Sequence, residues 1–185
     1  MALDPAAVAL LQQMEEAGGP ALNELSPEES REAAQGFAEL GGPGDDVADQ
    51  SDRTIPGSGG AIPVRVYTPD GDGPFPCLVY FHGGGWVIGN LITHDADCRE
   101  ICIASGCIVV AVDYRLAPEH PFPAAPEDCY AVACWASIYG VDFGAKVGPI
   151  SIGGDSAGGN LAAAVALMAR DRQGPDFALQ LLLYP

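Results

Sequence analysis

Basic residues are scarce in this sequence. Its 185 residues include 8 Lys and Arg against 25 Asp and Glu, which gives a formal net charge of −17. Proteins that bind nucleic acid neutralise phosphates with Lys and Arg, and docking on anionic membrane surfaces uses the same side chains. The composition therefore argues against both kinds of partner.

Long apolar runs and paired cysteine motifs are also missing. No stretch of 18 apolar residues occurs, so we expect no membrane span. The N-terminus also has no basic segment followed by an apolar run, which is the pattern of a signal peptide. The lack of a Cys-x-x-Cys spacing leaves zinc-ribbon and thioredoxin interpretations without support. We expect the cysteines to be buried free thiols and the compartment to be reducing and cytoplasmic. They are Cys77, Cys98, Cys102, Cys107, Cys129 and Cys134.

The remaining composition is that of a folded chain. Hydrophobic residues make up 48% and charged residues 18%, which excludes a disordered protein. Residues 1–52 hold 12 of the 25 acids and a single base, so the front of the chain is strongly acidic. We divide the chain into N-terminal helices, residues 1–45, and a body, residues 46–185.

Two helices are expected before the first strand. Residues 4–17 carry apolar side chains at helical spacing. Ser26 is a candidate N-cap, followed by Pro27 at the first helical position and by Glu29, which completes a capping box. This second helix is expected to end near Leu40. The pair fits a simple docking arm or a cap over a pocket, and the sequence leaves both open.

In the body, strand-like runs alternate with helical stretches. This alternation predicts an α/β fold with a mostly parallel sheet and helices on both faces. We expect strands at residues 62–68, 77–81, 107–112, 149–153 and 178–184, and helices near 93–105, 124–140 and 157–171.

The segment Gly154-Asp155-Ser156-Ala157-Gly158 matches G-x-S-x-G, with a strand-like run before it and an alanine-rich helical stretch after it. That context is typical of a nucleophile elbow, in which a serine occupies a strained strand-to-helix turn between small neighbours. Ser156 is therefore the candidate nucleophile. A phosphate-binding loop is rejected because the Lys-Ser/Thr ending is missing and Asp155 would repel phosphate.

Three consecutive glycines follow the strand expected at residues 77–81, in the motif that begins with His82 and ends with Trp86. Bare backbone amides at this position are suited to an oxyanion hole. We expect the donors to be the N–H groups of Gly83, Gly84 and Ala157. His82 is expected to orient the loop by hydrogen bonding, with the role of general base as the weaker alternative. Trp86 is expected to be a packing anchor, with a platform for the substrate as the alternative.

With these motifs placed, the chain resembles the hormone-sensitive-lipase-like branch of the α/β-hydrolases, also called bacterial esterase family IV. The motifs that carry the resemblance are His82-Gly83-Gly84-Gly85-Trp86, Asp113-Tyr114-Arg115-Leu116-Ala117-Pro118-Glu119-His120-Pro121-Phe122-Pro123-Ala124-Ala125 and Gly153-Gly154-Asp155-Ser156-Ala157-Gly158-Gly159-Asn160.

The resemblance implies a carboxylesterase for short-to-medium acyl esters that needs no metal or organic cofactor and takes a small-molecule ester as its partner. It leaves association into a homo-oligomer open. It also implies an N-terminal cap, Ser156 as nucleophile, and a group of supporting residues around the site. These are His82, Asp113, Arg115, Glu119 and Asp155.

One departure from the family is large. In α/β-hydrolases the acid and the histidine follow the nucleophile in the chain. After Ser156 the sequence has no histidine, and its acids there, Asp171 and Asp176, fit exposed positions. His94 and His120 precede the serine and are weak candidates for a substitute base. We therefore expect an N-terminal portion of an esterase that lacks the triad Asp and His and is inactive by itself.

Two alternatives stay open. One is a binding protein on the same fold that has lost the catalytic histidine, and the other is a remnant without activity. An intact elbow and oxyanion loop favour the esterase over the binding protein, whereas the early end of the sequence fits a remnant.

Overall fold

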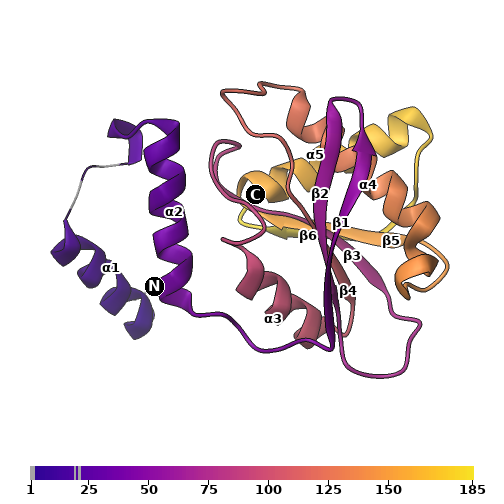
Figure 1. The fold of residues 1–185 in the computed structure, drawn as a ribbon, viewed down its shortest axis with the longest axis horizontal. Helices are drawn as coiled ribbons and strands as arrows, with labels where there is room; N and C mark the ends of the chain where they lie inside the picture. The colour runs from indigo at the N-terminus through magenta and orange to yellow at the C-terminus, as the bar shows by residue number, and fades with distance from the viewer. Residues whose placement is uncertain (1–2, 19, 21) are drawn as a thin grey trace.

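The computed structural model describes residues 3–18, 20 and 22–185 (Figure 1). Two helices and a two-stranded hairpin precede alternating strands and helices. In chain order the elements are α1 (Pro5–Ala17), α2 (Pro27–Gly41), β1 (Asp49–Gly57), β2 (Gly60–Thr68), β3 (Cys77–Phe81), α3 (Asp95–Ser105), β4 (Ile108–Val112), α4 (Ala124–Tyr139), β5 (Ile150–Asp155), α5 (Ala157–Arg172) and β6 (Phe177–Leu183), with short 3₁₀ helices at Leu22–Glu24 and Gly140–Phe143.

The strands form one six-stranded sheet in the order β1-β2-β4-β3-β5-β6. β3, β4, β5 and β6 are parallel, whereas β2 is antiparallel to both β1 and β4. The predicted α/β fold with a mostly parallel sheet is therefore confirmed. After β3 the chain turns to one side to form β4 and later returns to the other side to form β5. Such a switch point at the carboxyl ends of parallel strands is where α/β proteins bind ligands.

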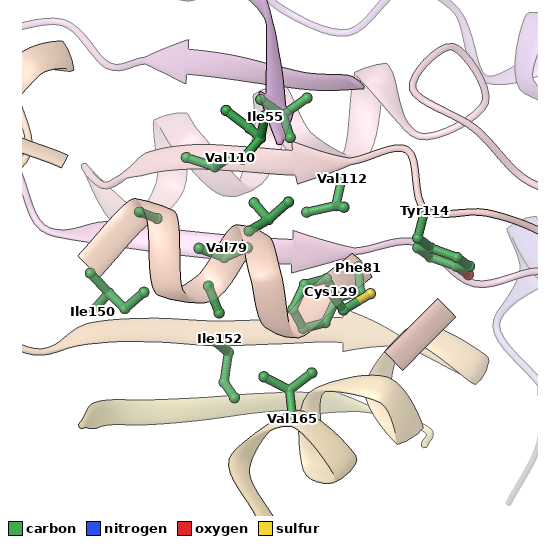
Figure 2. Packing of buried hydrophobic residues seen from close by; sticks show 14 of the residues in the cluster. Ile55, Val79, Phe81, Val110, Val112, Tyr114, Cys129, Ile150, Ile152 and Val165 are labelled. Atoms are coloured by element: carbon green, nitrogen blue, oxygen red, sulfur yellow. The ribbon is translucent and has the colours of Figure 1, made fainter. Parts of the chain in front are cut away.

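Helices cover both faces of the sheet and bury two groups of apolar side chains. α4 and α5 pack on one face, where Figure 2 shows Val79, Val110 and Ile152 from the strands meeting Cys129 and Val165 from the helices. α3 packs on the other face through a second cluster, which consists of Tyr67, Leu78, Tyr80, Cys98, Cys102, Val109 and Ala111. All residues of β3 and β4 are buried, as their continuous apolar runs predict.

Both N-terminal helices begin with capped N-termini, and α2 follows its predicted start signal. Asp4 caps α1 by accepting a hydrogen bond from the Ala6 N–H at 2.8 Å. Ser26 and Glu29 form the reciprocal capping box at the start of α2. Both helices lie to one side of the sheet (Figure 1). No helix in the described part of the chain is long and apolar enough to cross a membrane.

One strand, β1, is not predicted by the sequence pattern. Ile55 is its single buried residue, so β1 lacks the apolar alternation by which a half-buried strand is recognised. It forms because it pairs with β2 along its whole length, from Asp49 opposite Thr68 to Gly57 opposite Gly60. The Gly-Ser-Gly-Gly run at residues 57–60 is the hairpin signal that could have revealed it.

All six cysteines are free thiols, as predicted. Cys77, Cys98, Cys102 and Cys129 are buried, whereas Cys107 and Cys134 are partly exposed. Burial raises the pKa of the Cys77 thiol to about 12. The buried thiols therefore stay protonated and serve as small apolar side chains.

Candidate active site

The turn between β5 and α5 holds Ser156 in a backbone conformation that L-residues rarely adopt. β5 ends at Asp155 and α5 begins at Ala157, which leaves Ser156 in the turn with φ 49° and ψ −117°. Backbone strain of this kind costs about 1–3 kcal/mol and is concentrated at functional sites. The geometry is the strand–turn–helix that the G-x-S-x-G pattern predicts.

The glycines on either side of the turn lie directly against the end of β3. A Cβ atom on Gly154 would lie 2.3 Å from the carbonyl oxygen of Phe81, and one on Gly158 would lie 1.9 Å from the same oxygen. No side chain fits at either position, because the backbones themselves are in contact. This close approach packs the elbow tightly against the loop that follows β3.

Sheet register places that loop, residues 82–86, beside Ser156. β3 and β5 are adjacent parallel strands, with Phe81 opposite Gly154. The segments that leave the carboxyl ends of these strands therefore meet at the same edge of the sheet. The predicted nucleophile and the predicted oxyanion loop are brought together, although about 70 residues separate them in the sequence.

The first peptide group of the loop is fully engaged with the protein. The carbonyl oxygen of His82 accepts a hydrogen bond from the Tyr114 hydroxyl at 2.7 Å. The Gly83 N–H, on the opposite side of the same trans peptide, donates to Oδ1 of Asp155 at 2.9 Å. This contact contradicts the prediction that Gly83 is an oxyanion donor, because its proton is already bound to a buried carboxylate.

The next two peptide groups are arranged differently. The Gly83 carbonyl accepts a hydrogen bond from Nδ1 of His82 at 2.7 Å, and the Gly84 carbonyl accepts from the amides of Val87 and Ile88, just after the loop, at 3.0 and 2.9 Å. Because N–H and C=O point in opposite directions in a trans peptide, the N–H groups of Gly84 and Gly85 point away from these partners. Within the described residues, neither these amides nor that of Ala157 donates a hydrogen bond to the protein.

The carboxylate of Asp155 is buried beneath this loop. Its Oδ1 accepts from the Tyr80 hydroxyl and the Gly83 N–H, both at 2.9 Å, and its Oδ2 lies 3.7 Å from Nε2 of His94. Burial by itself raises the pKa of Asp155, but these donors outweigh it and hold the pKa at about 2. Asp155 is therefore ionised at neutral pH.

His82 is enclosed by the loop that it supports. Its ring stacks on Tyr114 with centroids 4.2 Å apart, and its buried Nε2 atom has no hydrogen-bond partner in the described part of the chain. Because the Gly83 carbonyl can only accept, Nδ1 of His82 carries the proton. Burial lowers the pKa of His82 to about 4. These contacts agree with a loop-orienting role for the imidazole, and no hydrogen bond links it to Ser156.

This burial makes stability depend on pH. Between pH 6.5 and about 4 the unfolded chain binds a proton on His82 that the folded protein does not, so the free energy of unfolding falls as the pH drops through this range. We expect a loss of at most about 3 kcal/mol. Urea denaturation at pH 7, 6, 5 and 4.5 measures it. In a His82→Gln variant this part of the pH dependence should disappear, and equal slopes in the two proteins would contradict the assignment.

The other two histidines lie elsewhere. His94 is at the N-cap position of α3, with Nδ1 2.9 Å from the Thr93 hydroxyl and Nε2 facing Asp155. His120 is exposed, in the loop before α4. Neither is hydrogen bonded to Ser156. Across the residues that the structure describes, no group of three or more His, Cys, Asp and Glu side chains could hold a metal ion.

Two of the three supporting residues predicted from the middle motif form ion pairs that hold the loop after β4. Arg115 binds the buried Asp128 through two side-chain hydrogen bonds of 2.8 Å, which ties the loop after β4 to α4. Glu119 forms a two-point ion pair with Arg31 of α2, at 2.9 and 2.7 Å. Asp113 is half-buried, and burial raises its pKa. Arg115 and Glu119 thus connect the loop after β4 to α4 and to α2.

A groove of about 580 Å³ lies beside the oxyanion loop. Its walls come from α5, from the first turn of α4 and from the segment between β4 and α4, and they are mostly apolar. Asn160, one helical turn after Ser156, lines it near the loop, and the 2.7 Å ion pair of Glu127 with Arg172 lies at the far end of α5. Trp86 is 43% exposed and lines the groove, so it is not the packing anchor that we predicted.

A strained turn between a parallel strand and a helix, set beside a glycine loop at the sheet's switch point, is the architecture of the α/β-hydrolase class. The family model described as alpha/beta hydrolase fold matches residues 78–185, and the chain belongs to this family.

Several proteins similar to this chain are named as esterases or ester hydrolases. The chain is 54% identical over 142 residues to the carboxylic ester hydrolase LipN of Mycobacterium tuberculosis, covering 74% of this chain and 38% of the relative. It is 39% identical to an arylesterase of Saccharolobus solfataricus, covering 71% and 43%. The predicted relationship to hormone-sensitive-lipase-like esterases is thereby confirmed.

Solved structures of esterases are also similar to this chain. A hyperthermophilic esterase from Pyrobaculum calidifontis matches with a TM-score of 0.93 and 42% identity, covering 100% of this chain and 59% of that one. An ester hydrolase from the metagenome of Lake Arreo, complexed with a derivative of bipyridine phosphonate, also matches with a TM-score of 0.93, at 40% identity and with 60% of its chain covered. The present chain spans about two fifths of these curated relatives and three fifths of these structures.

Proposed function

We propose that this chain is the nucleophile-bearing part of a serine carboxylesterase, with Ser156 as the nucleophile. The observation that carries the proposal is the strained turn at Ser156 beside three amides that have no acceptor among the described residues, those of Gly84, Gly85 and Ala157. Ala157 is also the first residue of α5, where the helix dipole favours negative charge. The esterase names of the relatives support the same reaction class.

In this reaction Oγ of Ser156 attacks the ester carbonyl carbon, and the carbonyl oxygen becomes an oxyanion. The amides of Gly84, Gly85 and Ala157 donate hydrogen bonds to that oxygen, and each such donor is worth about 3–4 kcal/mol in the transition state. Collapse of the intermediate expels the alcohol and leaves an acyl ester on Ser156. Water then hydrolyses this ester and regenerates the serine.

A general base must take the Ser156 proton and deliver it to the departing alcohol. All three histidines precede Ser156 in the sequence, and none is hydrogen bonded to it in the described residues. In α/β-hydrolases the acid and the base follow the nucleophile. We assign both to a C-terminal segment of the complete protein, for which the greater length of the relatives leaves room, and we expect the 185-residue chain by itself to have little or no turnover.

The groove supports an apolar ester as the substrate. Beyond Gly85 and Asn160 its walls are formed by Trp86, Leu161, Leu167 and Met168. Such walls favour hydrocarbon groups, at about 0.8 kcal/mol for each buried methylene. Esters with short-to-medium acyl chains are the substrates that we propose.

The experiment that tests the function is covalent labelling. A phosphonate derivative is bound to one of the structural relatives, so a p-nitrophenyl phosphonate ester is a suitable probe. The complete protein should hydrolyse p-nitrophenyl butyrate, and this activity should fall in proportion to the incorporation of one phosphonyl group. Peptide mass spectrometry should locate the group on Ser156. Full activity after labelling, or a label on another residue, would contradict the proposal.

We further propose that residues 1–45 act as a cap, attached to the site through Arg31. Nε of Arg31 donates to the Val87 carbonyl at 2.8 Å, and one of its terminal nitrogens donates to the Ala117 carbonyl at 3.0 Å. Val87 directly follows the oxyanion loop, two residues after Gly85. The guanidinium therefore joins α2 to the end of this loop and also to Glu119.

A prediction follows for Arg31→Lys. A lysine ammonium cannot reproduce the planar, multi-point contacts of a guanidinium. We expect faster proteolysis of the α2 segment and a KM for p-nitrophenyl butyrate raised several-fold in the complete protein. Arg170→Lys, at an exposed pair with Asp171, is the matched control. If both variants behave like the wild type, α2 is not held by Arg31.

A further inference from the structure

Asp155 contacts the elbow and the oxyanion loop at the same time. Its backbone immediately precedes Ser156, and its carboxylate extends beneath Gly83. The fit is close: a Cβ atom on Gly83 would lie 2.1 Å from Oδ2 of Asp155. The side chain of Asp155 is 12% exposed. A single side chain thus spans the two halves of the site.

Four groups surround the carboxylate. Oδ1 receives the Tyr80 hydroxyl and the Gly83 N–H, each at 2.9 Å. Oδ2 receives the Tyr184 hydroxyl at 3.4 Å and faces Nε2 of His94 at 3.7 Å. Tyr80 is buried in β3, so the oxygen that binds Gly83 is itself held by a rigid strand. The position of Oδ1 is therefore well defined.

The charge of Asp155 does not favour the proposed reaction. A negative carboxylate beside a developing oxyanion repels it, and Asp155 has no hydrogen bond to Ser156 by which it could act on the proton. The geometry of the contact offers a different role. Because the Gly83 N–H is hydrogen bonded to Asp155, the orientation of its peptide group is fixed, and this restricts the two peptide groups that follow.

Resting on the function proposed above, we propose that Asp155 is a positioning residue for the oxyanion hole: its Oδ1 holds the Gly83 N–H and thereby aims the Gly84 and Gly85 amides at the substrate oxygen. The role belongs to an acceptor atom at a defined place and not to the negative charge. His82 completes the arrangement from the other side, since its Nδ1–H binds the Gly83 carbonyl.

This role separates two substitutions that look alike. Asparagine at position 155 keeps an oxygen acceptor for the Tyr80 hydroxyl and the Gly83 N–H but has no charge. Alanine removes the acceptor altogether. Loss of an oxyanion donor typically lowers kcat about 10²–10³-fold. The kcat of Asp155→Ala should fall by nearly as much, because its amides no longer point at the substrate oxygen. The kcat of Asp155→Asn should stay within about tenfold of the wild type. KM should change little in both.

A comparison of two substrates measures how much the oxyanion donors contribute to the rate. An ester and its thionoester differ in one atom, and the sulfur of the thionoester is a weak hydrogen-bond acceptor. An enzyme that relies on oxyanion donors therefore prefers the ester. The experiment measures the ratio of kcat for the ester to kcat for the thionoester in the complete protein, for the wild type, Asp155→Asn, Asp155→Ala and Tyr80→Phe.

We expect Asp155→Ala to reduce this ratio at least tenfold, Tyr80→Phe to reduce it by less, and Asp155→Asn to keep it within about threefold. Asp128→Asn is the matched control, since Asp128 is a buried carboxylate bound to Arg115. It should lower thermal stability and leave the ratio unchanged.

Two results would overturn the inference. Equal losses for both substrates in Asp155→Ala would mean that the carboxylate supports the elbow or the fold, and a ratio in Asp155→Asn as low as in Asp155→Ala would mean that charge is decisive. If Asp155→Ala does not fold, Tyr80→Phe and Asp155→Asn decide alone. Failure of the proposed function is distinct: the wild type would then hydrolyse neither ester, and the phosphonate would not label Ser156.

Discussion

Replacing Ser156 by alanine is expected to lower ester hydrolysis by the complete protein at least about 10⁴-fold, because the proposed nucleophile is removed and no acyl intermediate can form. The variant should also resist phosphonate labelling. Hydrolysis of p-nitrophenyl butyrate, measured with enough protein to detect a residual rate, gives the result. Activity within tenfold of the wild type would contradict the mechanism.

The matched control is Ser151→Ala. Ser151 is a half-buried serine in β5, only five residues before the elbow, and it is outside the turn. Its replacement should leave activity within a few-fold of the wild type. A comparable loss in both variants would point to a damaged strand.

The backbone strain at Ser156 predicts that a glycine at this position abolishes activity but stabilises the fold. Its φ of 49° and ψ of −117° suit glycine, which has no Cβ atom to clash with the neighbouring peptide groups. Ser156→Gly should therefore be inactive and yet raise the free energy of unfolding by about 1 kcal/mol or more. Urea denaturation of Ser156→Gly and Ser156→Ala measures the difference. If glycine is no more stable than alanine, the turn is not strained.

Gly158→Ala is expected to impair the site and the fold together. The added methyl group would lie 1.9 Å from the carbonyl oxygen of Phe81 and 2.7 Å from that of His82, so the elbow and the oxyanion loop must move apart by more than 1 Å. A displacement of about 1 Å at a catalytic centre can cost about 10²-fold in rate. Overpacking of this kind typically costs about 1–3 kcal/mol of stability. Activity assays and thermal unfolding measure the two effects.

Gly36→Ala is the matched control, because Gly36 also lies within a helix but has no atom within 4 Å of an added Cβ. Alanine restricts the unfolded chain and favours the helix, so this variant should be as stable as the wild type or more stable, by up to about 1 kcal/mol. If Gly158→Ala is equally well tolerated, the close contact between the elbow and β3 is not required.

The fold was predictable wherever a signal is local. β3 and β4 are buried on both faces and therefore appear as continuous apolar runs, and the capping box at Ser26 and Glu29 is contained within four residues. The elbow is equally local, since the small neighbours of Ser156 are required by its own turn. β1 had no such signal, because it is held by pairing with β2 and buries only Ile55.

At the candidate site, too, some features follow from the local sequence and others depend on the fold. The amino-acid sequence alone marks Ser156 and the glycine loop as candidates, and it has no histidine after the serine. It cannot say which glycine amides are available, because that depends on the Asp155 carboxylate, which reaches Gly83 from 72 residues away. In the same way, the partner of Glu119 is Arg31, 88 residues earlier.

The positions of most helices and strands, and the candidate residues of the site, are thus encoded locally, in glycine spacing, apolar periodicity and capping residues. The partner of each polar group is decided only when the sheet brings distant segments together, because a buried hydrogen bond depends on distance and direction in space and not on separation along the chain. For this reason the motif marks the glycine loop as a candidate, whereas the fold determines which of its amides are engaged: Gly83 donates to Asp155, and the amides of Gly84 and Gly85 have no acceptor among the described residues.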